Sequence, residues 1–133
     1  TKKIQIEARV LGDLALNHIV PTATKYQSSL LDNVIKMEQV IGKEEGDRLS
    51  AENIELVKQM AAHVAEICRL VTELVERRKV ANRIASEREK AIAYHDTVAP
   101  MLEEIRSHID DLELVVDNEL WTLPKYRELL FIV

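Results

Sequence analysis

The feature that most constrains this chain is an apolar stripe in which residues recur at intervals of three and four. Its members are Val57, Met60, Val64, Ile67, Val71 and Leu74. This spacing places them on one face of an α-helix. Residues 49–94 contain neither glycine nor proline. We therefore predict one long helix within 48–94, with roughly 40 helical residues and a length of about 60 Å. The stripe thins after Leu74, so its core contact is expected to weaken there.

Two shorter periodic segments precede this helix. The first carries a stripe of Ile4, Ala8, Leu11, Leu14 and His18, and the second one of Tyr26, Leu30, Val34, Met37 and Ile41. Pro21 separates them and should kink or break the helix, because proline lacks a backbone N–H and clashes with the preceding turn. Residues 1–41 are thus predicted as one kinked helix or a helix pair. The polar stretch 42–47, with a glycine near each end, is predicted as a loop.

A last periodic segment is predicted as a helix over 97–118. Its stripe consists of Val98, Leu102, Ile105, Ile109, Leu112 and Val116. Asp96 or Thr97 would cap it, and Pro100 is tolerated in a first turn.

Amphipathic helices bury their apolar stripes on one another, and short connections place neighbours antiparallel. We predict an all-α fold, an antiparallel up-down helical bundle of three to four long helices with a short C-terminal anchor segment. The 133 residues suit a single domain, and 47% of them are apolar, enough for a core. The net charge of −5 argues against a general nucleic-acid binder. No apolar run reaches the length of a membrane span.

The sequence contains no constellation typical of catalysis, cofactor binding or metal binding. A di-metal bundle site needs Glu-x-x-His on two helices, and the nearest approach is Glu104 with His108, four positions apart. His63, His95 and His108 are expected to lie singly. Cys68, the sole cysteine, cannot form an internal disulfide and is expected to be a small core residue. We predict no catalytic, cofactor-binding or metal-binding residue.

A basic cluster lies between residues 77 and 90. It comprises Arg77, Arg78, Lys79, Arg83, Arg88 and Lys90, with Glu76, Glu87 and Glu89 interleaved. Such a pattern is typical of a solvated helix face with internal ion pairs. The alternative is a contact with an acidic surface on another domain or subunit.

The segment 119–133 differs in composition from the rest of the chain, because it holds the only Trp and the only Phe. Nine of the fourteen residues from 120 to 133 are large and apolar. Such density needs a partner surface, so this segment either covers its own bundle or docks on another domain. The predicted anchor residues are Trp121, Leu123, Pro124, Tyr126, Leu130 and Phe131.

The anchor segment also carries a family resemblance. The string Leu120-Trp121-x-Leu123-Pro124-Lys125-Tyr126-Arg127-Glu128-Leu129-Leu130-Phe131 resembles the C-terminus of type III glutamine synthetases, except that Thr122 stands where proline is expected. Four further runs resemble earlier parts of that family's C-terminal helical region, in the right order: 6–13, 17–23, 25–27 and 77–82.

The resemblance implies a cytoplasmic parent enzyme that joins ammonia to glutamate, using ATP and Mg²⁺, within a dodecameric homo-oligomer. The ligands of that chemistry belong to upstream regions, and the start at Thr1 without Met suggests a longer protein. This chain would then be an inactive structural and assembly domain. It would contact the catalytic domain and neighbouring subunits, with no nucleic-acid or membrane partner. Alternatives are a free-standing helical interaction module and a regulatory ligand site within the bundle.

Overall fold

The structure, a computed structural model, describes residues 2–116, and every regular element in that range is helical. The predicted all-α fold class is therefore confirmed. The elements, with η denoting a π-helical turn, are α1 (Lys2–Leu14), η1 (Ala15–Ile19), α2 (Val20–Ile41), α3 (Lys43–Leu49), α4 (Ala51–Asn82), α5 (Glu87–Ala93), η2 (Tyr94–Val98) and α6 (Ala99–Val115).

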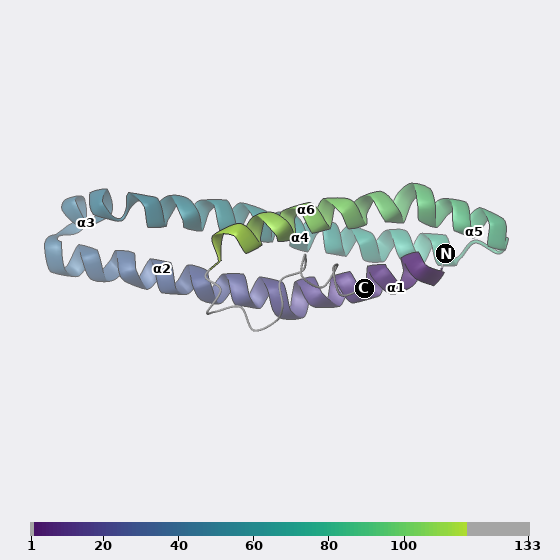
Figure 1. The fold of residues 1–133 in the computed structure, drawn as a ribbon, viewed down its shortest axis with the longest axis horizontal. Coiled ribbons are helices and arrows are strands. Elements are labelled where there is room, and N and C mark those ends of the chain that lie inside the picture. The colour runs from purple at the N-terminus through teal and green to yellow at the C-terminus, as the bar shows by residue number, and fades with distance from the viewer. Residues whose placement is uncertain (1, 117–133) are drawn as a thin grey trace.

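These elements form three rods (Figure 1). Rod 1 joins α1, η1 and α2 without interruption, rod 2 is α4, and rod 3 joins α5, η2 and α6. The chain reverses direction at α3 and again between α4 and α5, so rod 2 runs antiparallel to both of its neighbours. This is the predicted up-down arrangement with three rods. The predicted anchor segment, 119–133, lies outside the described residues.

The rods differ in length, which divides the bundle into two parts. Rod 3 ends partway along rods 1 and 2, so that α2 and α4 continue as a pair towards α3 (Figure 1). We call this two-helix continuation the distal arm. Val34 is buried in it, whereas Leu31, Ile35 and Val40 are exposed.

The stripe of rod 3 forms the centre of the core. All six of its predicted residues are buried: Val98, Leu102, Ile105, Ile109, Leu112 and Val116. The stripe of rod 2 buries Met60, Ile67, Val71 and Leu74 in the same cluster, with Val64 partly buried against it. The burial of these side chains is the main favourable contribution to holding the rods together.

Pro21 does not break rod 1. The π-helical turn η1 comes directly before it, and Val20 N–H donates to the carbonyl of Ala15 instead of to Leu16. A π-turn holds one residue more than an α-turn, which gives the proline ring room. The fully buried positions of the stripe are consequently Ala15 and Ile19, whereas the predicted Leu14 is partly buried against the core. The inclusion of His18 in the predicted stripe is wrong, because the π-helical turn leaves His18 exposed.

Rod 3 also contains a π-helical turn shortly before a proline, Pro100. The turn η2 ends two residues ahead of the proline, and Ala99 N–H donates to the carbonyl of Tyr94. The helix therefore does not begin at residue 97 as predicted. It begins at Glu87, where the Ser86 hydroxyl accepts from Glu89 N–H at 3.3 Å. The Ser-x-x-Glu spacing of a capping box marks this start in the sequence.

The predicted long helix over 48–94 is wrong beyond Asn82, where α4 ends. Its last turn tightens, with Arg83 N–H donating to Val80 and Ile84 N–H to Ala81, each at 3.2 Å. No glycine or proline marks this reversal. It allows Tyr94 and Val98 to fold back and become fully buried, so tertiary packing overrides local helix preference here.

The predicted loop over 42–47 is shorter than expected. Only Gly42 lies outside a helix, with a φ of 105°, a left-handed conformation that favours glycine. Residues 43–49 form the short helix α3, and Gly46 is buried against α2. The stretch is polar because most of α3 faces solvent.

A polar network ties the three rods together near the α4–α5 reversal. The hydroxyl of Tyr94, a fully buried residue, donates to Asn82 Oδ1 at 2.5 Å. Gln5 Nε2 donates to the Tyr94 oxygen at 3.2 Å and to Asn82 Oδ1 at 3.3 Å. Each rod thus contributes one residue to the network: Gln5 from rod 1, Asn82 from the end of rod 2 and Tyr94 from rod 3.

Replacing Tyr94 by Phe should lower the free energy of unfolding by about 1–2 kcal/mol, because Asn82 and Gln5 lose a partner in a partly buried site. Urea denaturation of the chain measures this loss. Tyr26→Phe makes the same chemical change away from the network and should change stability less. Equal effects of the two variants would show that the network contributes nothing.

Candidate functional site

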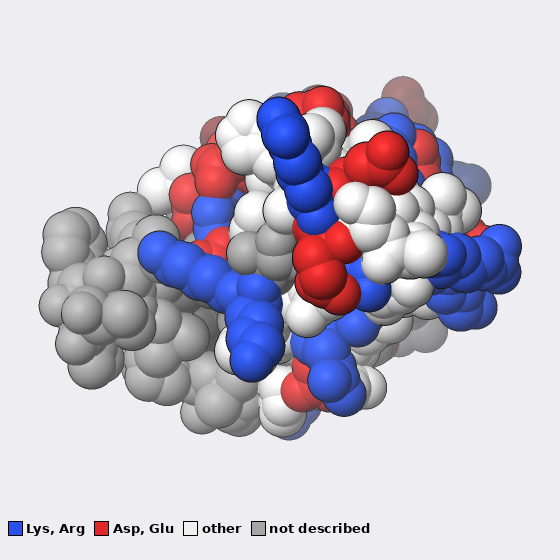
Figure 2. Space-filling view, turned by 90° about the vertical axis from the view of Figure 1, so that its right-hand side faces the viewer, with Lys and Arg blue, Asp and Glu red and all other residues white. Residues whose placement is uncertain are grey.

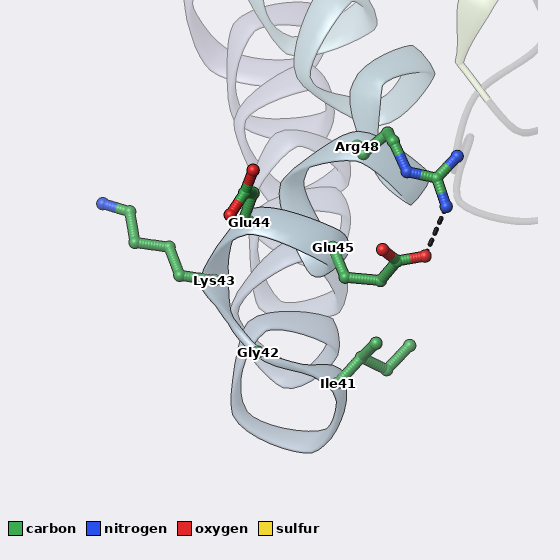
Figure 3. A pocket seen from close by; sticks show the side chains of 6 residues that line it. All are labelled: Ile41, Gly42, Lys43, Glu44, Glu45 and Arg48. Atoms are coloured by element: carbon green, nitrogen blue, oxygen red, sulfur yellow. Dashed lines mark hydrogen bonds and ion pairs between the residues drawn. The ribbon is translucent and has the colours of Figure 1, made fainter.

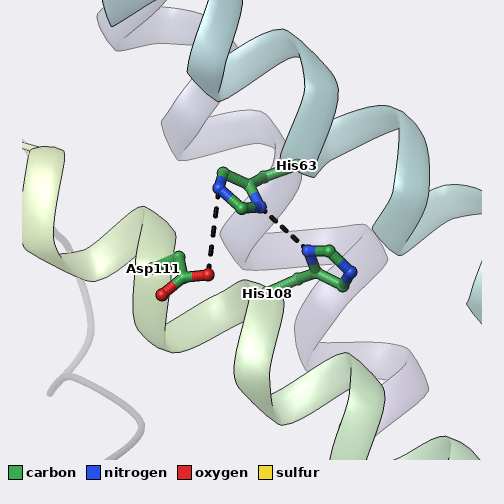
Figure 4. Close-up of side chains that lie close together, drawn as sticks. All are labelled: His63, His108 and Asp111. Carbon is green, nitrogen blue, oxygen red and sulfur yellow. Dashed lines mark hydrogen bonds and ion pairs between the residues drawn. The ribbon is translucent and has the colours of Figure 1, made fainter.

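Two histidines that are 45 positions apart in the sequence meet between α4 and α6. His63 and His108 place their Nδ1 atoms 2.8 Å apart, with the ring centroids 5.1 Å apart and the rings tilted by 57° (Figure 4). At this distance one Nδ1 donates a hydrogen to the other, so a neutral pair holds a single shared hydrogen. The expectation that these histidines lie singly is wrong.

Asp111 completes the group. It stands three residues after His108, which places both on one face of α6. Its Oδ2 lies 3.9 Å from His63 Nε2, on the side of that ring away from His108 (Figure 4). One ligand atom from each of the three residues lies within 4.8 Å of the others. The side chain of His63 is 28% exposed and that of Asp111 51%, so the group is open to solvent ions.

Charged residues surround this group on α4. Arg69 donates to Glu66 Oε1, and this hydrogen bond lowers the pKa of Glu66. A charged His108 lowers the pKa of Glu66 further, which places that carboxylate in the electrostatic neighbourhood of the histidine pair. Glu66 raises the pKa of Arg69 in return. Glu66 and Arg69 are solvated, so their pairing contributes little to stability.

The geometry offers imidazole and carboxylate ligands to a cation, but it does not resemble a nucleophile with its base. Sequence reasoning missed the group because the axial alignment of α4 against α6 decides which residues meet. The His108-x-x-Asp111 spacing was the one readable signal. His95 is a useful contrast, since within residues 2–116 it pairs only with its neighbour Asp96, at 3.1 Å, and it is 82% exposed.

Three of the six residues of the basic cluster, Arg77, Lys79 and Lys90, form ion pairs within the described part of the chain, as expected of a solvated face. Arg77 bridges to Glu73 at 2.6 Å and donates to the Thr97 carbonyl at 2.9 Å, linking α4 to η2. Lys79 pairs with Glu76 and Lys90 with Glu87. Figure 2 shows basic and acidic side chains interspersed at this end of the molecule. The alternative role in a subunit contact stays a prediction.

A surface hollow lies at the α2–α3 reversal (Figure 3). Ile41, Gly42, Lys43, Glu44, Glu45 and Arg48 line it. Arg48 forms an ion pair with Glu45 within the hollow. The charged residues of the hollow are two glutamates, one lysine and one arginine, and one glutamate already pairs with the arginine. This lining indicates no particular chemistry. Cys68, expected in the core, is only partly buried.

The six predicted anchor residues, Trp121, Leu123, Pro124, Tyr126, Leu130 and Phe131, lie outside the described residues. Their role stays a prediction. Among the helices of residues 2–116, none combines the length and apolar character needed to cross a bilayer.

The fold and site define an all-helical, three-rod domain whose polar clusters link helices to one another. Comparison with known proteins shows what this domain is similar to. Residues 1–38 match the family described as glutamine synthetase C-terminal domain.

Named relatives extend this match to nearly the whole chain. A glutamine synthetase of Bacteroides fragilis is 53% identical over 131 residues. A type-3 glutamine synthetase of Dictyostelium discoideum is 27% identical over 138 residues, and a glutamine synthetase of Butyrivibrio fibrisolvens is 23% identical over 131. Each match covers 98% of this chain and 18% of the relative. The resemblance to the C-terminal helical domain of type III glutamine synthetases is confirmed.

Proposed function

We propose that this chain serves as the C-terminal structural and assembly domain of a glutamine synthetase. The carrying observation is a 53% identity that spans 98% of this chain and only 18% of a relative named as that enzyme. The parent enzyme would ligate ammonia to glutamate with ATP and Mg²⁺, in the cytoplasm. The catalytic ligands would lie outside this chain, which alone would be inactive.

Exposed apolar side chains on the rods support a role in contacts. Ile6 and Val10, one turn apart on α1, are 61% and 60% exposed, and Leu114 on α6 is 69% exposed. Val40 at the tip of the distal arm is 84% exposed. These surfaces suit the catalytic domain of the same enzyme and neighbouring subunits of a homo-oligomer, which we propose to be a dodecamer. The apolar segment 119–133 would anchor the domain.

Deleting residues 120–133 from the full-length protein tests the anchor. We expect loss of the largest oligomer and a lower melting temperature, because nine large apolar side chains lose their partner surface. Analytical ultracentrifugation and calorimetry measure the two effects. A truncated protein with the oligomer size and melting temperature of the intact one would rule the anchor out.

Point variants within the same segment separate apolar anchoring from a general effect of truncation. The double variant Trp121→Ala with Phe131→Ala should reproduce most of the deletion's effect. Lys125→Ala, which removes a charge but little apolar area, should leave the oligomer intact. The sequence upstream of Thr1 in the gene separates the enzyme domain from the alternative, a free-standing interaction module.

A further inference from the structure

We propose that His63, His108 and Asp111 bind one divalent transition-metal ion, which fastens α6 to α4. The proposal concerns a site between two helices of the bundle. It rests on the juxtaposition of two imidazoles and a carboxylate from different rods, with one ligand atom from each within 4.8 Å of the others.

The arrangement of the histidine nitrogens favours a cation. The two Nδ1 atoms face each other across 2.8 Å, so their lone pairs converge on one position that a single hydrogen now fills. A Zn²⁺ ion bound at about 2.0–2.1 Å from each nitrogen needs them roughly 3.3 Å apart. The rings therefore have to separate by about 0.5 Å, and the Asp111 carboxylate, which now faces His63 Nε2, has to turn towards the ion. Binding would move the shared hydrogen from Nδ1 to Nε2 of the ring that carries it, so that both imidazoles bind as neutral ligands.

The ligand chemistry selects the class of ion. Imidazole suits zinc, copper, nickel and iron, whereas an oxygen-rich group would be needed for Mg²⁺ or Ca²⁺. Three protein ligands leave a fourth tetrahedral position for water. The 51% exposure of Asp111 leaves an entry path for the ion and for that water.

The position of the site suggests what the ion does. His108 and Asp111 lie in the last two turns of α6, which ends at Val115, whereas His63 lies in the middle of α4. A metal there would hold the end of rod 3 against rod 2, next to the start of the distal arm. It would thereby fix the point from which residues 117–133 depart.

Calorimetric titration of the untagged chain with ZnCl₂ tests the site. We expect one ion per chain and, at a free Zn²⁺ concentration 100 times the Kd, a rise in melting temperature of roughly 8 °C. His63→Ala and His108→Ala should each weaken binding by more than the roughly 10–100-fold that removal of an outer partner costs. Asp111→Asn should weaken it by at least about 10-fold.

His95→Ala is the matched control, since it removes an exposed histidine next to an aspartate elsewhere on the surface, and it should leave binding unchanged. Circular dichroism establishes that each variant keeps its helices. NMR of the histidine rings gives a second measurement on the unaltered chain: Zn²⁺ should move the signals of His63 and His108 together and leave those of His18 and His95 in place. Absence of Zn²⁺ binding, or binding that survives both His63→Ala and His108→Ala, would overturn the proposal.

Discussion

Gly46→Ala is expected to lower the free energy of unfolding by about 2–3 kcal/mol, at the upper end of the usual cost of overpacking. A Cβ atom at this position would lie 2.8 Å from both the N and the Cα of Glu38 and 2.9 Å from the carbonyl carbon of Met37. These are backbone atoms of α2, which no side-chain rotation can move. The helix α3 would have to shift away from α2, opening the reversal that joins rods 1 and 2.

Gly12→Ala is the matched control for this prediction. Its added Cβ would meet Val71 Cγ1 at 3.8 Å, an ordinary contact. Because alanine favours a helix over glycine, this variant should gain roughly 0.5–1 kcal/mol. In urea denaturation, the two variants should change the free energy of unfolding in opposite directions. A stable Gly46→Ala variant would mean that α3 does not pack closely on α2.

Ile105→Ala is expected to cost about 3 kcal/mol, within the range measured for large-to-small changes in cores. Ile105 is fully buried and stands at the centre of the rod 3 stripe. Truncation removes its apolar contacts with the other rods and leaves a cavity that rigid helix backbones close only in part. The midpoint of chemical denaturation should fall, with little change in its slope.

Leu114→Ala on the same helix supplies the comparison. Leu114 is 69% exposed, so its truncation should change stability by no more than about 0.5 kcal/mol. A comparable loss from both variants would indicate that Leu114 is covered, for example by residues 117–133. The pair of variants therefore also reports on the segment that the structure does not describe.

Periodicity predicted the six-residue stripe of rod 3 correctly, because one α-helical phase holds from Val98 to Val116, but it missed Tyr94 and Met101, which are also buried. The same reasoning failed at His18, which is exposed, because a π-helical turn changes the phase within rod 1; Leu14 still packs against the core but is only partly buried. A pattern read with a fixed period of 3.6 residues cannot register an extra residue in one turn. Proline was correctly read as a disturbance, but the turn before it accommodates the proline without ending the helix.

The sequence prediction missed the start of α5 and the histidine pair for two different reasons. Ser86 and Glu89 form a readable capping signal that the strong helical content of 49–94 obscured. The meeting of His63 with His108 has no local signal, because it depends on how far α4 and α6 slide along each other. That alignment results from the packing of the whole core.

The two π-helical turns bear on how this domain tolerates changes in length. Deleting one residue within η1 would convert it to an ordinary α-turn and keep the stripes on either side in line, whereas a deletion within α2 would rotate everything after it by about 100°. The shortened η1 would, however, press the ring of Pro21 against the preceding turn. The extra residue and the proline therefore form one unit, which a viable homologue gains or loses as a pair.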